Sequence, residues 1–132
     1  MAELHRQTNS QQNLKMSDVA KQTFFRIMQL WGVTDNQARI LLGQPSKATL
    51  YNWKRLSGGK LPHDTLERVS YIVGIYKALQ ILFPDPKQAD AWMTKPNQHF
   101  GNQSALEKML AGNVADIHAV RQYLDYARGG YA

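Results

Sequence analysis

Side chains that can hydrogen-bond to nucleic-acid bases and phosphates lie close together between residues 44 and 55. Asparagine pairs with adenine through two hydrogen bonds, and lysine or arginine reaches guanine or a phosphate. Free backbone N–H groups at a helix start can also hold a phosphate. The candidate DNA-binding residues are Gln44, Ser46, Lys47, Thr49, Tyr51, Asn52, Lys54 and Arg55. The competing interpretation is a polar helix face that contacts only solvent.

Two short helices joined by a tight turn are predicted to position these side chains. Thr34 begins a capping box, which predicts a helix that ends at Gly43. Ser46 is placed to cap a second helix, with Leu50 and Trp53 three residues apart on its inward face. This pattern is typical of a helix-turn-helix.

The charge of the chain is concentrated in the same half. Residues 1–60 hold nine Lys and Arg and three Asp and Glu, whereas residues 61–132 hold seven of each. The formal net charge of +6 therefore comes entirely from the first half. Such an excess favours binding to a polyanion, because neutralising phosphates releases counterions. A basic surface that only aids solubility would give the same count.

Catalytic chemistry has little support in this sequence. The histidines His5, His63, His99 and His118 are scattered, and no two of them have a metal-ligand spacing. There is no glycine-rich phosphate loop, no HExxH and no Gly-x-Ser-x-Gly. The chain contains no cysteine, which excludes thiolate metal sites and a cysteine nucleophile. We therefore predict no enzyme, no catalytic residue, no metal and no cofactor.

The rest of the chain is predicted to be helical, so the expected fold is all-α with no strand. We expect a disordered polar arm over residues 1–16, and Ser17 as the cap of the first helix. Asp64 is expected to cap a long helix over 65–83, which Pro84 ends. Further helices are expected from Pro86, Ser104 and Val114, with a loop over 95–103.

The long helix has almost no polar side. A helix that is apolar nearly all round must be enclosed, so the 65–83 segment is either the core of one chain or the interface of a homodimer. A dimer would suit DNA binding, because paired half-sites add affinity.

Several short runs, taken in order, resemble the Xre/MbcA/ParS antitoxins. The first part carries ARILLG at 38–43, TLYNW at 49–53, LP at 61–62 and LF at 82–83. The second part carries AW at 91–92, PN at 96–97, FG at 100–101, SALEKML at 104–110 and VRQYL at 120–124. Ala105 departs from the family, which usually has proline after the serine.

The resemblance implies an antitoxin of a type II toxin–antitoxin system. Such a protein represses its own operon with one half, and with the other covers the active site of a RES-domain toxin that consumes NAD or transfers ADP-ribose. Carried over by position, the toxin-binding residues are Trp92, Asn97, Phe100, Gly101, Arg121, Arg128, Gly129, Gly130 and Tyr131.

These predictions divide the chain into a polar arm (1–16), a helix-turn-helix and dimerisation domain (17–84) and a toxin-binding domain (85–132). The predicted partners are the cognate toxin, operator DNA and a second copy, with no membrane. The lack of cysteine and of an apolar leader fits the cytoplasm. The alternative function is a plain dimeric repressor whose second half senses a ligand or only dimerises.

Overall fold

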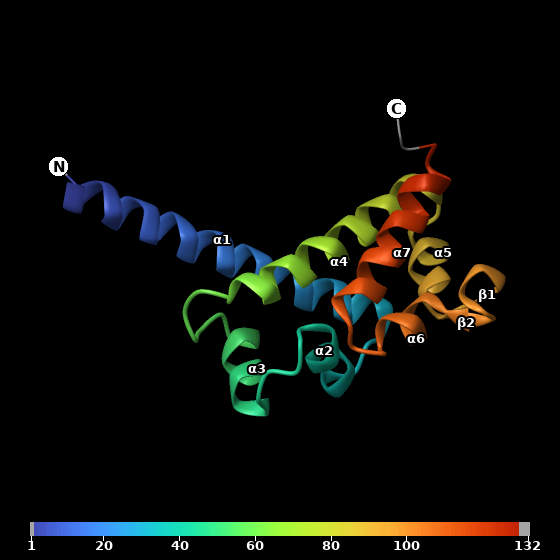
Figure 1. Ribbon diagram of the computed structural model, residues 1–132, viewed down its shortest axis with the longest axis horizontal. Helices are drawn as coiled ribbons and strands as arrows, with labels where there is room; N and C mark the ends of the chain where they lie inside the picture. Colours follow the sequence, from blue (N-terminus) through green and yellow to red (C-terminus); the bar gives the residue numbers. More distant parts are fainter. Residues whose placement is uncertain (1, 130–132) are drawn as a thin grey trace.

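A computed structural model describes residues 2–129, with side chains from residue 11 onward. It confirms the all-α prediction, because helices make up most of the chain (Figure 1). The α-helices are α1 (Ala2–Trp31), α2 (Asp35–Leu41), α3 (Lys47–Lys54), α4 (His63–Leu82), α5 (Pro86–Ala91), α6 (Ala105–Met109) and α7 (Val114–Ala127). Two 3₁₀ helices, Trp92–Thr94 and Gln98–Phe100, and two short strands, β1 (Pro96–Asn97) and β2 (Gln103–Ser104), lie between α5 and α6.

The helix α4 is the centre of the fold. It packs against α1 on one side and α7 on the other (Figure 1). Its inward residues Val69, Ile72 and Ile75 are at most 2 % exposed. The buried side chains of the long helix are thus covered within one chain, whereas Leu66 and Val73 are only half-buried and Ile81 is exposed. Pro62 occupies the cap position and makes no side-chain cap bond, so the predicted Asp64 cap is wrong.

The helix α1 corrects the expectation of a disordered arm before residue 17. It runs without interruption from Ala2, because no proline or glycine occurs before Gly32 to break it. Ser17 is therefore not a helix cap. It is 1 % exposed, and its Oγ accepts a hydrogen bond of 3.0 Å from the backbone N–H of Leu61. The first half of α1 projects away from the remaining helices (Figure 1).

The segment after α5 also differs from the expected loop. The strands β1 and β2 pair antiparallel, with Pro96 opposite Ser104 and Asn97 opposite Gln103. The prediction of no strand is wrong at these positions, because two-residue strands are too short for alternation in the sequence to reveal them. The predicted capping box at Ser104 is confirmed, with its Oγ accepting from the backbone N–H of Glu107 at 3.0 Å.

Candidate functional site

The turn between α2 and α3 is built by two consecutive residues with positive φ. Gly43 has φ +94° and Gln44 has φ +63°, a region that glycine enters without strain. The backbone N–H of Gln44 donates to the carbonyl of Arg39 at 2.8 Å, which closes α2. The predicted capping box at Thr34 and the predicted cap at Ser46 are both confirmed. These local signals fix the angle at which α3 leaves the turn.

The helix α3 is anchored by its apolar residues and exposes its polar ones. Leu50 and Trp53 are 7 % and 5 % exposed, so they hold α3 against the core. The candidate DNA-binding residues all lie on α3, at its ends or in the preceding turn, and the structure brings them together. Exposed residues are Gln44, Ser46, Lys47, Tyr51, Lys54 and Arg55, and half-buried residues are Thr49 and Asn52.

Contacts within this face organise three of its side chains. The guanidinium of Arg55 lies 4.6 Å from the centre of the Tyr51 ring, and its Nη2 donates to Asn52 Oδ1 at 3.5 Å. The Nζ of Lys54 pairs with Asp35 of α2 at 2.8 Å, so much of its charge is compensated. In the described part of the chain Lys47 has no ion pair. Lys47 and Arg55 are therefore the cations most available to a phosphate.

Lys21 of α1 holds the segment that follows α3 in place. It was not among the residues predicted from the sequence. Its side chain is 1 % exposed. Its Nζ donates to the carbonyls of Ser57, at 3.1 Å, and Gly59, and it lies 3.4 Å from the carboxylate of Asp18. Lys21 thus fastens the segment that follows α3. The available signal was its spacing, because it lies three residues before the buried Phe24 on an inward-facing stripe.

Arg68 of α4 connects the two halves of the molecule. Its Nη1 donates to the carbonyls of Leu41, at 3.5 Å, and Gly112, at 3.1 Å. A Cβ built on Gly43 would lie 3.2 Å from the Nε of Arg68. The turn before α3 therefore packs directly on Arg68, which also holds the turn between α6 and α7.

An aromatic cluster forms around the short strands in the second half. Trp92 stacks on Tyr123 at 6.1 Å between ring centres, and Phe100 meets both rings edge to face. The ring centres of His99 and Tyr123 lie 4.6 Å apart. Trp92 and Phe100 were predicted from the family resemblance, whereas His99 and Tyr123 were missed. The predicted residues therefore belong to a local core, with Phe100 8 % exposed and Trp92 half-buried.

Asn97 and Gly101 shape the loop that carries this cluster. The Oδ1 of Asn97 accepts from the backbone N–H of His99 at 2.8 Å and so caps the 3₁₀ helix. Gly101 ends that helix with φ +66°. Both residues therefore hold the loop in shape.

Arg121 lies apart from the aromatic cluster. It is two residues before Tyr123 on α7, and residues with that spacing face different sides of a helix. Its Nε donates to both carboxylate oxygens of Asp125, at 3.1 and 3.0 Å. A Cβ on Gly74 of α4 would coincide with its guanidinium. The structure therefore does not bring all the predicted toxin-binding residues into one surface.

The end of α7 contains the remaining predicted residues. The Nη1 of Arg128 lies 4.0 Å from the Oδ1 of Asp125. Gly129 has φ +74°. Gly130 and Tyr131 lie outside the described residues.

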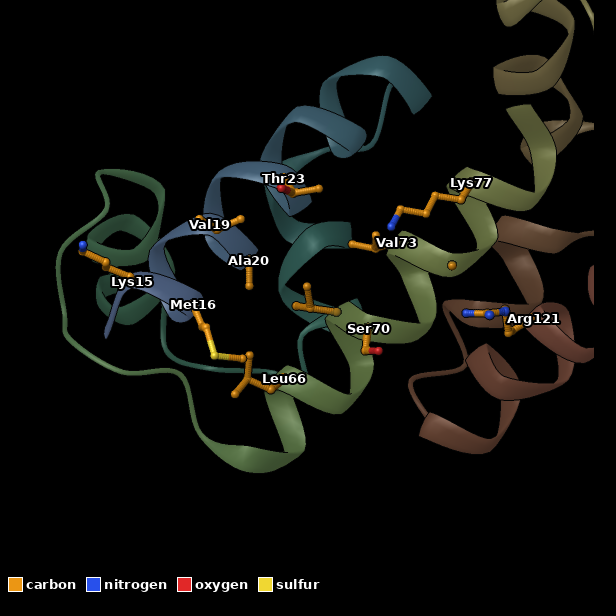
Figure 2. Close-up of a pocket in the computed structure, with 12 residues that line it drawn as sticks. Lys15, Met16, Val19, Ala20, Thr23, Leu66, Ser70, Val73, Lys77 and Arg121 are labelled. Carbon is orange, nitrogen blue, oxygen red and sulfur yellow. The ribbon is translucent and has the colours of Figure 1, made fainter. Parts of the chain in front are cut away.

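A groove runs along α1 and α4 and reaches α7 (Figure 2). It has a volume of about 740 Å³, and its lining is mostly apolar. Arg121 and Lys77 lie at one end, and Lys15 lies at the other (Figure 2). Sequence reasoning did not predict this groove, because residues before 17 were expected to be disordered.

One carboxyl group in the second half has a shifted pKa. Burial of Asp90 on α5 raises the pKa of its carboxyl above 3.8, and a hydrogen bond of 3.4 Å from Gln80 partly opposes this shift. Within residues 2–129, no group of three or more acidic or histidine side chains is placed to hold a metal ion. No helix in that range is long and apolar enough to cross a membrane.

Comparisons with known proteins match almost the whole chain to two domains. Residues 16–74 match the antitoxin Xre-like helix-turn-helix domain, and residues 78–130 match the antitoxin Xre/MbcA/ParS C-terminal toxin-binding domain. A curated protein of Sinorhizobium fredii (strain NGR234), named uncharacterized protein y4oB, is 49% identical over 109 residues. The aligned region covers 83% of this chain and 84% of that protein. The two matched domains lie in the order that the structure shows, a helix-turn-helix followed by the aromatic loop region. The chain therefore belongs to the Xre/MbcA/ParS family of antitoxins.

Proposed function

We propose that this antitoxin neutralises a RES-domain toxin that consumes NAD, and that it represses its own operon by binding DNA as a homodimer. The proposal places it in the cytoplasm, with residues 17–84 binding DNA and residues 85–132 covering the toxin's active site. One observation carries it: a single chain presents a basic helix-turn-helix face on α3 and, well apart from it, an aromatic loop around β1 and β2 (Figure 1).

The DNA-binding part of the proposal is supported by the chemistry of α3. Its outward face carries the amide of Asn52 together with the exposed Lys47 and Arg55. The buried Leu50 and Trp53 hold the opposite face of the helix against the core. Asn52 is the side chain that we propose reads a base, because an amide can make two hydrogen bonds to adenine. Lys47 and Arg55 would contact phosphates.

The toxin-binding part is supported by the location of aromatic and arginine residues. Such residues concentrate binding energy in protein interfaces. Trp92 is half-buried and His99 is exposed, so the aromatic cluster offers part of its surface to a partner. Arg128 and Gly129, at the end of α7, are exposed as well. The proposed contact therefore combines this loop with the end of the chain.

The test is co-expression with the protein encoded by the adjacent gene, followed by pull-down and an assay of NAD depletion. A stable complex that stops NAD loss would support the proposal. Absence of a complex, with specific DNA binding intact, would favour the plain dimeric repressor whose second half senses a ligand or dimerises.

Deletion of residues 128–132 separates the two activities. We expect the shortened chain to lose neutralisation and to keep its affinity for operator DNA, because α3 is distant from the end of α7 (Figure 1). Full neutralisation by the shortened chain would refute a role for this end of the chain. Asn52→Ala provides the reciprocal variant, which should neutralise the toxin and bind the operator poorly.

A further inference from the structure

We propose that the pocket between α2 and α3 binds a phosphate of the DNA backbone through Arg39 and Lys47, and that Asp35 keeps Lys54 out of that contact. The inference deepens the proposed function, since it rests on the DNA binding proposed there. It assigns a new residue, Arg39, to DNA binding, and it leaves Lys54 without a phosphate. Its test requires neither the toxin nor knowledge of the operator sequence.

The pocket lies beside the candidate DNA-binding residues. It has a volume of about 510 Å³, and both helices of the helix-turn-helix line it. Three of its lining residues, Lys47, Tyr51 and Lys54, are exposed residues of α3 that the sequence predicted to bind DNA. When the second helix of such a motif enters the major groove, the first helix crosses the sugar–phosphate backbone. A pocket between the two helices is therefore where a backbone phosphate passes.

Arg39 is a half-buried cation of this pocket without a partner. Its Nε is buried and makes no hydrogen bond, and within residues 11–129 its side chain makes no ion pair. Asp35 lies four residues before it on α2, a spacing that permits an ion pair, but the carboxylate of Asp35 binds Lys54 instead. Removing a polar group from water without supplying a hydrogen bond is unfavourable. The unpaired guanidinium therefore indicates an anion from outside the chain.

A backbone phosphate is the anion that fits this position. A guanidinium can donate two parallel hydrogen bonds to phosphate oxygens, and such charge-assisted bonds are stronger than neutral ones. Lys47 also lines the pocket, is exposed and has no ion pair in the described part of the chain. Since backbone contacts set the register of a protein on DNA, a phosphate held by both cations would fix how α3 lies against the bases.

The ion pair of Asp35 with Lys54 limits what the third cation of the pocket can do. The Nζ of Lys54 lies 2.8 Å from the Oδ1 of Asp35, and the two side chains are 43 % and 69 % exposed. An exposed ion pair of this kind contributes little to stability. A phosphate that approaches Lys54 nevertheless meets the carboxylate as well, and this like-charge contact opposes binding. Asp35 therefore lowers the sequence-independent affinity for DNA and favours the phosphate position at Arg39 and Lys47.

The first experiment compares Arg39→Gln with Arg26→Gln, which remove the same charge. Arg26 is a matched control, because it is exposed, lies on α1 and does not line this pocket. Affinity for a fluorescent random DNA duplex is measured by anisotropy over a range of salt concentrations, since each phosphate contact contributes about 0.9 to the salt slope. We expect Arg39→Gln to reduce the slope by about one unit and Arg26→Gln to leave it unchanged. An unchanged slope for Arg39→Gln, or equal losses for the two variants, would overturn the proposal.

Asp35→Asn tests the same pocket even if Arg39→Gln fails to fold, because Asp35 is exposed and asparagine keeps its shape. We expect this variant to bind the random duplex more tightly, with a salt slope steeper by about one unit, since Lys54 is then free to contact a phosphate. The added slope should disappear in the double variant Asp35→Asn/Lys54→Gln. A slope equal to that of the wild type in Asp35→Asn, or an added slope that persists without Lys54, would refute the role of Asp35.

The same titrations separate this inference from the function on which it rests. A wild type that binds neither the random duplex nor DNA from upstream of its own gene would refute the DNA-binding part of the proposed function. Normal binding by the wild type, with slopes that none of the pocket substitutions changes, would refute this inference alone.

Discussion

Lys21 provides the sharpest test of how the fold supports α3. Its ammonium is buried and donates to the carbonyls of Ser57 and Gly59, immediately after α3. Hydrogen bonds to a charged group contribute about 1.5–3 kcal/mol each, so the two bonds together have an upper value of ~3–6 kcal/mol. Replacing Lys21 with methionine keeps the apolar stem and removes both bonds.

Two effects reduce that upper value. Ser57 and Gly59 are exposed, so their carbonyls can regain hydrogen bonds from water. Methionine also avoids the desolvation cost of a buried ammonium. We therefore expect Lys21→Met to lower the free energy of unfolding by ~2 kcal/mol, and the Tm by roughly 6–10 °C.

Urea denaturation followed by far-UV circular dichroism measures this change. Lys60→Met is the matched control, because Lys60 is an exposed lysine in the same loop and should change stability by less than ~0.5 kcal/mol. A loss below ~0.5 kcal/mol for Lys21→Met, or equal losses for the two variants, would refute the role assigned to this buried lysine.

Asn52→Ala should weaken operator binding by about 1–3 kcal/mol while sparing random DNA, measured by fluorescence anisotropy; equal loss on both would mean that Asn52 reads no base. Lys47→Ala should reduce the salt slope of binding by about one unit, measured in a salt titration, if Lys47 contacts a phosphate; an unchanged slope would exclude that contact. Because burial raises the pKa of Asp90, its ionised carboxylate destabilises the fold above the unfolded pKa, and this penalty disappears as the pH falls below that value. Asp90→Asn should therefore stabilise the protein slightly at pH 7, by at most ~0.5 kcal/mol. Urea denaturation repeated at successively lower pH should show that this gain disappears in acid; a gain that is independent of pH would contradict this account. Gly74→Ala should displace only the guanidinium end of the flexible Arg121 side chain, so the preference of alanine over glycine in a helix, about 1 kcal/mol, should raise the Tm in thermal melts; a lower Tm would show that Arg121 cannot relocate without disturbing the α4–α7 packing.

The sequence predicted best where structure is set by local chemistry. The capping boxes at Thr34 and Ser104 and the cap at Ser46 were all visible, because each depends on residues three apart. The candidate DNA-binding residues were likewise found together, since one short helix carries most of them.

Long-range contacts account for what the sequence could not predict. Ser17 has the type of a helix cap, yet its hydroxyl bonds to Leu61, 44 residues away. Lys21 is a charged residue that a sequence pattern assigns to the surface, and its burial depends on carbonyls from a distant loop. Trp92 and Phe100 were named only through the family resemblance, and their packing together could not be predicted, because Tyr123 joins them from α7.

The central position of α4 bears on how antitoxins of this family can be recombined. The two matched domains meet between residues 74 and 78, inside one continuous helix. In a chimera joined at that boundary, each parent would supply one part of α4. The mixed helix would then have to pack against both α1 and α7, because both lie along it. Arg68 adds a second connection, since it bonds to carbonyls on both sides. Exchange of toxin specificity between relatives should therefore transfer α4 together with its packing partners, and the two halves should melt as one cooperative unit.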